Sequence, residues 1–77
     1  MRLIKYIRYP SGFVIFSEPM AHKEIHVREG ENPISAGFCR YDKNKNKWLC
    51  YGSSVTLNLS FEDVDSDLLT KQMNGEW

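Results

Sequence analysis

Two β-type runs enclose a polar turn in the second half of this chain, and they limit the folds that it can adopt. In ISAGFCRYDKNKNKWLCYGSSVTLNL, the runs at residues 34–41 and 47–59 lie on either side of a segment rich in Asp, Asn and Lys. Runs of β-branched and aromatic residues that enclose such a turn are typical of a β-hairpin. We therefore predict a hairpin with Asn44 and Lys45 at the centre of its turn.

The position of this turn also predicts the register of the hairpin. An even-length loop places Tyr41 opposite Trp48 and, two residues further along each strand, Cys39 opposite Cys50. Opposite cysteines are close enough for a cross-strand disulfide after a small adjustment. The other interpretation, which we favour, is two reduced thiols that pack as small apolar side chains, because the chain shows no export signal.

The N-terminal segment predicts another hairpin, over residues 2–17. LIKYIRY and FVIFS are rich in β-branched and aromatic residues, and Pro10 and Gly12 between them favour a turn. Residues 19–28 then form either a short helix, entered at Pro19, or a loop or third strand, since IHV is poor in helix-forming residues.

The apolar period changes after Leu59 from that of a strand to that of a helix. We predict an amphipathic helix over residues 61–73, capped at Ser60 and ended by Asn74 and Gly75. Acidic residues near its start and a lysine near its end match the helix dipole. The whole pattern predicts a single α+β domain over residues 1–77, a small antiparallel sheet of two hairpins with the C-terminal helix packed on one face.

Length and charge limit the classes of function. A chain of 77 residues, 42% of them hydrophobic, builds one core of marginal stability, and proteins of this size often gain stability from a second subunit. We therefore expect a homodimer. Ten basic and ten acidic side chains balance, and a nucleic-acid binder usually carries a basic excess, so we do not expect nucleic acid as a partner. No apolar stretch reaches the about 20 residues of a membrane span, and we expect a cytoplasmic protein with no membrane partner.

His22 and His26 stand four residues apart and can share a metal ion from one face of a helix or a strand. A structural zinc site needs four ligands, often with a close cysteine pair, and Cys39 and Cys50 are too far apart in sequence to form such a pair. A Cys₂His₂ site built from opposite strands is the alternative that stays open. HKEIH also differs from the H-E-x-x-H pattern of metalloproteases, and YGSSV lacks the G-x-S-x-G frame of hydrolases. We expect surface or capping histidines, no metal, no cofactor and no enzymatic activity.

Six residues are candidates for contact with a ligand or a partner: His22, Ser35, Tyr51, Ser53, Ser54 and Trp77. The hydroxyls of CYGSSVT can bind an anionic or nucleotide-like ligand, although the same residues also suit a β-bulge with solvated serines. The small residues around Ser35 allow a ligand, another backbone or the helix to approach closely. Trp77 offers a large apolar surface to a partner or to its own sheet.

Four segments, GFVIFSE, ISAGFCRY, CYGSSVTLNL and DLLTKQM, together with His22, resemble a small uncharacterised protein family of tailed bacteriophages and prophages. The resemblance covers about residues 12–73. It implies a protein without an enzymatic motif that acts by occupying a surface or a ligand, as many host-takeover and counter-defence proteins do. The relatives carry a fuller helical segment after the histidine, whereas HVREGENP is polar and broken here.

These observations predict a non-catalytic binding or inhibitory protein of phage type that acts on a host protein. The alternative is a protein that sequesters a small nucleotide-like ligand around Tyr51, Ser53 and Ser54. A third hypothesis is a metal- or nucleic-acid-associated role through His22 and His26.

Overall fold

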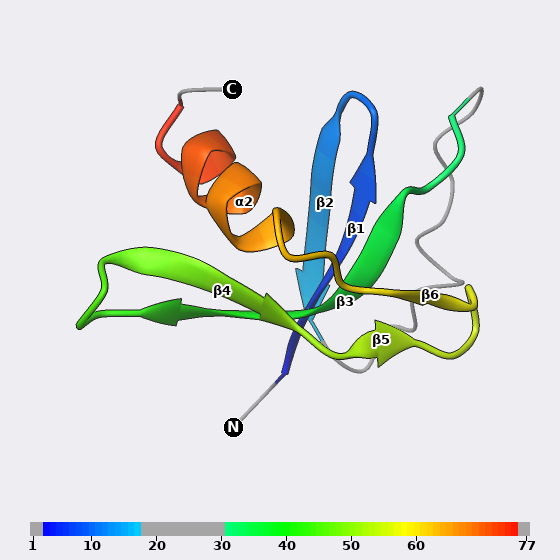
Figure 1. Ribbon diagram of the computed structural model, residues 1–77, viewed down its shortest axis with the longest axis horizontal. Coiled ribbons are helices and arrows are strands. Elements are labelled where there is room, and N and C mark those ends of the chain that lie inside the picture. Colours follow the sequence, from blue (N-terminus) through cyan, green and yellow to red (C-terminus); the bar gives the residue numbers. More distant parts are fainter. Residues whose placement is uncertain (1–2, 18–30, 76–77) are drawn as a thin grey trace.

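The computed structural model describes residues 3–17 and 31–75 as an α+β fold (Figure 1). Its elements are β1 (Ile4–Tyr9), β2 (Gly12–Ser17), β3 (Ser35–Asp42), β4 (Lys47–Tyr51), β5 (Ser53–Ser54), β6 (Leu59–Ser60) and α2 (Asp65–Met73). The first four strands form an antiparallel sheet in the order β2-β1-β3-β4, and β5 pairs with β6 in a small second sheet. The predicted fold class is confirmed. The predicted segment 19–28 lies outside the described residues.

Both predicted hairpins are present in the main sheet. The strands β1 and β2 pair through the turn at Pro10, and β3 pairs with β4 in the predicted register, with Tyr41 opposite Trp48 and Cys39 opposite Cys50. The second turn is stabilised locally, because the Asp42 carboxylate accepts hydrogen bonds from the backbone N–H groups of the two central turn residues at 2.9 and 3.2 Å.

The β-type run over residues 47–59 breaks at Gly52, where the sequence favours a bulge or bend, but its second half does not continue the same strand as predicted. β4 ends at Tyr51, and residues 53–60 fold back on themselves as the β5–β6 hairpin. Two left-handed residues make this possible, Gly52 with φ of +76° and Asn58 with φ of +54°. Glycine and asparagine are the residues that adopt this conformation most readily.

The helix begins later than predicted. Ser60 is not its cap, since it pairs with Ser53 in the small sheet, and the N-cap position is Val64, which has no side-chain cap. The C-terminal end is confirmed, because the N–H groups of Asn74 and Gly75 donate to backbone carbonyls of the last turn at 3.0 Å and Gly75 has φ of +78°.

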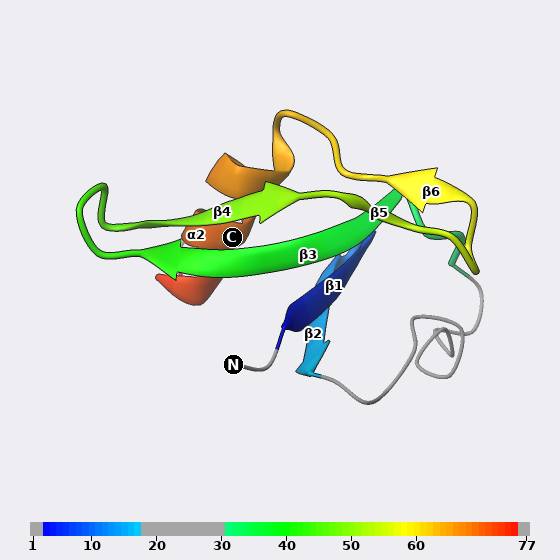
Figure 2. The ribbon, with the colours of Figure 1, turned by 90° about the horizontal axis from the view of Figure 1, so that it is seen from below.

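Two apolar clusters lie on opposite faces of the main sheet, since neighbouring residues of a strand point to opposite sides. α2 covers one face (Figure 1, Figure 2), where the buried residues are Tyr6, Phe13, Cys39, Cys50 and Leu69. On the other face, Ile7, Tyr9 and Ala36 are buried, with Leu57 and Leu59 of the β5–β6 hairpin packed against them. Among the described residues, no helix is long and apolar enough to cross a membrane.

Candidate functional site

Gly52 turns the chain away from the main sheet and so positions the serines of the predicted site. A Cβ at this residue would stand 2.9 Å from the ring of Phe38, so both the space and the backbone angle require glycine. Phe38 in turn stacks on Tyr51, with ring centroids 5.8 Å apart and an interplanar angle of 26°. The Phe61 N–H closes the bend by donating to the Gly52 carbonyl at 3.0 Å.

Ser54 organises the turn of the β5–β6 hairpin. Its side chain is buried, and its Oγ accepts a hydrogen bond from the Leu57 N–H at 3.3 Å. The Asn58 N–H donates to the Val55 carbonyl at 3.2 Å and closes the turn. Leu57 and Leu59 then anchor the hairpin on the main sheet. These contacts hold the hairpin in place beside β3.

The β5–β6 hairpin forms an open pocket of about 310 Å³. Its lining residues are Ser53, Ser54, Val55, Asn58, Leu59 and Ser60. This volume is at the lower end of the range for ligand pockets, roughly 300–1,000 Å³. Hydroxyl and amide groups both donate and accept hydrogen bonds, and none of the lining residues is charged. The pocket therefore suits a neutral polar group better than a phosphate.

A buried polar network lies where α2 begins, and sequence reasoning missed it. The fully buried Asp65 accepts hydrogen bonds at Oδ2 from the Tyr6 hydroxyl at 2.5 Å and from the Glu62 N–H at 2.9 Å. Its Oδ1 lies 3.0 Å from Arg8 Nε in an ion pair, but the Nε–H donates to Ser35 Oγ at 3.1 Å, so Oδ1 receives no directional hydrogen bond. Arg8 Nη2 reaches Glu62 Oε1 at 2.5 Å.

This network ties the start of α2 to β1 and β3, so we interpret it as a structural element of the fold. Burial, followed by the hydrogen bond and the negative charge of Asp65, raises the pKa of Tyr6 far above its usual range. The phenol therefore stays protonated and remains a donor. The sequence signal was the placement of Arg8 on the same strand face as Tyr6, because a charge that faces a core needs an opposite charge.

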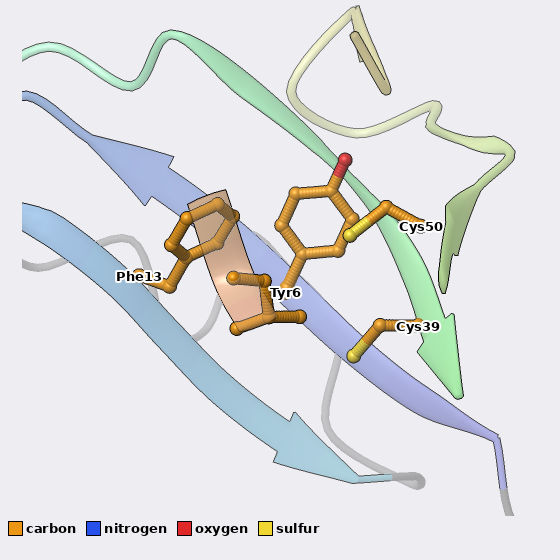
Figure 3. Close-up of a cluster of buried hydrophobic side chains, with 5 residues drawn as sticks. Tyr6, Phe13, Cys39 and Cys50 are labelled. Carbon is orange, nitrogen blue, oxygen red and sulfur yellow. The ribbon is translucent and has the colours of Figure 1, made fainter. Parts of the chain in front are cut away.

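Cys39 and Cys50 lie beside Tyr6 and Phe13 in the core under α2, as Figure 3 shows. Both are buried free thiols, in agreement with the favoured interpretation. Burial raises the pKa of Cys39 from 9.0 to about 12, and burial together with the nearby Cys39 and Asp65 raises the pKa of Cys50 to about 12. Thiols that stay protonated at neutral pH are poor nucleophiles and poor metal ligands.

The structure describes four of the six predicted site residues, and it does not bring all four together. Tyr51, Ser53 and Ser54 lie together at the bend, although only the two serines line the pocket and Ser54 is buried. Ser35 is fully buried and accepts the hydrogen bond from Arg8, so it faces the core and not an outside partner.

The close approach predicted beside Ser35 comes from β4. A Cβ on Gly37 would stand 2.5 Å from the Tyr51 carbonyl oxygen. The backbone of the neighbouring strand, and not a ligand or the helix, is therefore what packs closely against this small residue. Asn58 and Ser60 line the pocket without having been singled out, because their side chains meet only once residues 53–60 fold back.

His22, His26 and Trp77 lie outside the described residues. Within residues 3–17 and 31–75, no group of three or more His, Cys, Asp or Glu is placed to hold a metal ion. Comparison of the chain with protein-family models, with curated proteins and with solved structures finds no match in any of the three.

Proposed function

We propose that this chain is a non-catalytic binding protein of phage or prophage origin that acts in the host cytoplasm by covering the surface of a host protein. The observation that supports it is the exposure of Val55 in the turn of the β5–β6 hairpin and of apolar side chains that flank this hairpin in the sequence. Val55 is 90% exposed in the turn, and Tyr51, Phe61 and Val64 are also exposed. Four of the eight large exposed apolar side chains of the described residues therefore fall between residues 51 and 64.

A valine at the tip of a turn is unusual, because turns favour Gly, Asn, Asp, Ser and Pro. Exposed apolar residues that stand singly are ordinary on a protein surface, so the groups beside Val55 decide whether it suits a protein interface. Val55 lines the same pocket as Ser53 and Asn58, so apolar contact and hydrogen bonding are available side by side. The resemblance to a small phage family supports a host protein as the partner.

Site-specific photo-crosslinking tests this proposal. A photoreactive amino acid replaces Val55 in one variant and Met73, which is 49% exposed at the end of α2, in the control. We expect the Val55 position to crosslink one dominant protein of a bacterial lysate and the Met73 position not to. With that protein purified, Val55→Asp should weaken binding at least about tenfold, as expected for a residue at the centre of an interface. Equal crosslinking from both positions would contradict the proposal.

The pocket favours a second candidate function, the sequestration of a small nucleotide-like ligand. Its four polar lining residues and its lack of charge suit the base or sugar of such a ligand. We expect nucleosides to raise the melting temperature of the wild-type protein and of a Met73→Ser control, and to leave that of Ser53→Ala unchanged. A melting temperature that no nucleoside or nucleotide changes would exclude this candidate.

A further inference from the structure

The two edges of the main sheet differ in how their backbone groups are satisfied. On the β4 edge, the Trp48 N–H donates to Thr70 Oγ1 and the Cys50 N–H donates to Ser66 Oγ, both at 2.9 Å. These hydroxyls belong to neighbouring turns of α2. The helix therefore closes this edge with its own side chains.

On the β2 edge, the hydrogen bonds that the described part of α2 makes to the backbone are confined to Phe13. The Phe13 N–H donates to Gln72 Oε1 at 2.8 Å, and Gln72 Nε2 donates to the Phe13 carbonyl at 3.2 Å. This contact shows that Phe13 directs its backbone groups away from β1, and by the two-residue period of a strand Ile15 and Ser17 do the same. Among the described residues, nothing is hydrogen-bonded to the outward backbone groups of Ile15 and Ser17.

The sequence of β2 lacks the devices that keep an open edge from pairing. Residues 12–17, GFVIFS, contain no charged residue and no proline, and they are rich in β-branched and aromatic side chains. Charges, prolines and bulges are the usual protection of edge strands, and an edge without them pairs readily with another strand. The absence of charge also removes any repulsion when this strand is placed against a copy of itself.

We propose that β2 pairs with the β2 strand of a second copy of this chain, antiparallel about a two-fold axis beside Phe16. In this register Ile15 pairs with Ser17 of the second copy and Ser17 with Ile15, so four backbone hydrogen bonds form. Phe16 then lies opposite Phe16 as a cross-strand aromatic pair. Gln72 keeps its contacts with Phe13, because the pairing begins beyond that residue. The two main sheets join into one eight-stranded sheet, and this contact does not depend on the function proposed above.

Sedimentation equilibrium of the full chain tests this inference. We expect the apparent mass of the wild-type protein to rise toward twice the monomer mass as its concentration is raised to about 0.5 mM. An interface of four backbone hydrogen bonds is weak, so the dimer forms only at such high concentrations. Ser17→Pro removes an N–H that points away from β1, so it should stay monomeric with an unchanged circular dichroism spectrum. Ser17→Ala keeps the N–H and should dimerise as the wild type does.

Amide hydrogen exchange gives a second readout that needs no variant. The Ile15 and Ser17 amides should exchange at least about tenfold more slowly at high than at low protein concentration, whereas the Phe13 amide, held by Gln72, should not change. A wild-type protein that stays monomeric at the highest concentration, a folded Ser17→Pro variant that still dimerises, or exchange of both amides that is independent of concentration would each overturn the inference.

Discussion

The Tyr6 hydroxyl donates a hydrogen bond of 2.5 Å to Oδ2 of Asp65, and these two residues are 59 positions apart in the chain. This contact joins strand β1 to the first residue of helix α2. Arg8 supplies the opposite charge from the same strand, at 3.0 Å from Oδ1. The helix is thus held at its start by polar contacts and along its length by Leu69 in the core.

Removal of the Tyr6 hydroxyl should destabilise the fold. Tyr6→Phe leaves a fully buried carboxylate with one hydrogen bond fewer, and we expect the free energy of unfolding to fall by about 1–3 kcal/mol. Asp65→Ala leaves Arg8 without its buried partner and should cost about 3–5 kcal/mol. Urea denaturation followed by circular dichroism measures both values.

Tyr41→Phe is the matched control for this prediction. The Tyr41 hydroxyl bonds the side chain of Asn46 on the exposed hairpin tip, where water replaces a lost partner. We expect a change within about 0.5 kcal/mol. A Tyr6→Phe variant as stable as the Tyr41→Phe variant would show that the buried hydrogen bond contributes nothing net.

Replacement by alanine should destabilise the fold more at Gly37 than at Gly75. A Cβ on Gly37 would stand 2.5 Å from the Tyr51 carbonyl oxygen, and a backbone atom cannot move aside cheaply, so Gly37→Ala should cost at least about 2–3 kcal/mol. Gly75 has φ of +78° and open space around it, so Gly75→Ala should cost only about 1–2 kcal/mol. Thermal denaturation of both variants checks the order, and the reverse order would refute this account of Gly37.

The buried thiols should make the free energy of unfolding fall as the pH becomes alkaline. The folded state raises the pKa of Cys39 and Cys50 from 9.0 to about 12, so the unfolded chain loses its thiol protons first as the pH rises. Their contribution is therefore fully present below about pH 8, and the free energy of unfolding falls between about pH 9 and 12, by up to about 1.4 kcal/mol per pH unit for each thiol.

Urea denaturation at a series of pH values measures this slope. Replacement of both Cys39 and Cys50 by alanine lowers the overall stability but should also make the alkaline slope shallower, and the difference between the two slopes isolates the thiols from Tyr6 and the lysines. Identical slopes in the two proteins would mean that the thiols ionise equally easily in the folded and unfolded states.

The hydroxyls of α2 should protect the β4 edge from solvent. In the double variant Ser66→Ala and Thr70→Val, the amides of Trp48 and Cys50 lose their acceptors, and we expect their hydrogen exchange to accelerate at least about tenfold. The Leu49 amide points toward β3 and should be much less affected. Exchange measured residue by residue by nuclear magnetic resonance distinguishes loss of the edge contact from general unfolding, which would accelerate all three amides alike.

Local sequence signals predicted both hairpins, and the register of the second, because the decisive contacts there lie within a few residues. Asp42 caps the turn that follows it, and Gly75 ends the helix that precedes it. The candidate site was predicted only in part. Ser53 and Ser54 were found from their position beside Gly52, whereas Asn58 and Ser60 join them only because the chain folds back over residues 53–60.

Turn chemistry and side-chain period act over short stretches of chain, so the amino-acid sequence was enough to predict the strands of the main sheet, which strands pair in each hairpin and the C-terminal end of the helix. The start of α2 at Asp65 and the burial of Ser35 were decided by the tertiary structure, and so was the closure of one sheet edge by helix side chains. A carboxylate taken out of water needs a donor and an opposite charge wherever the fold places them, and Tyr6 and Arg8, which supply these two, come from the other end of the chain.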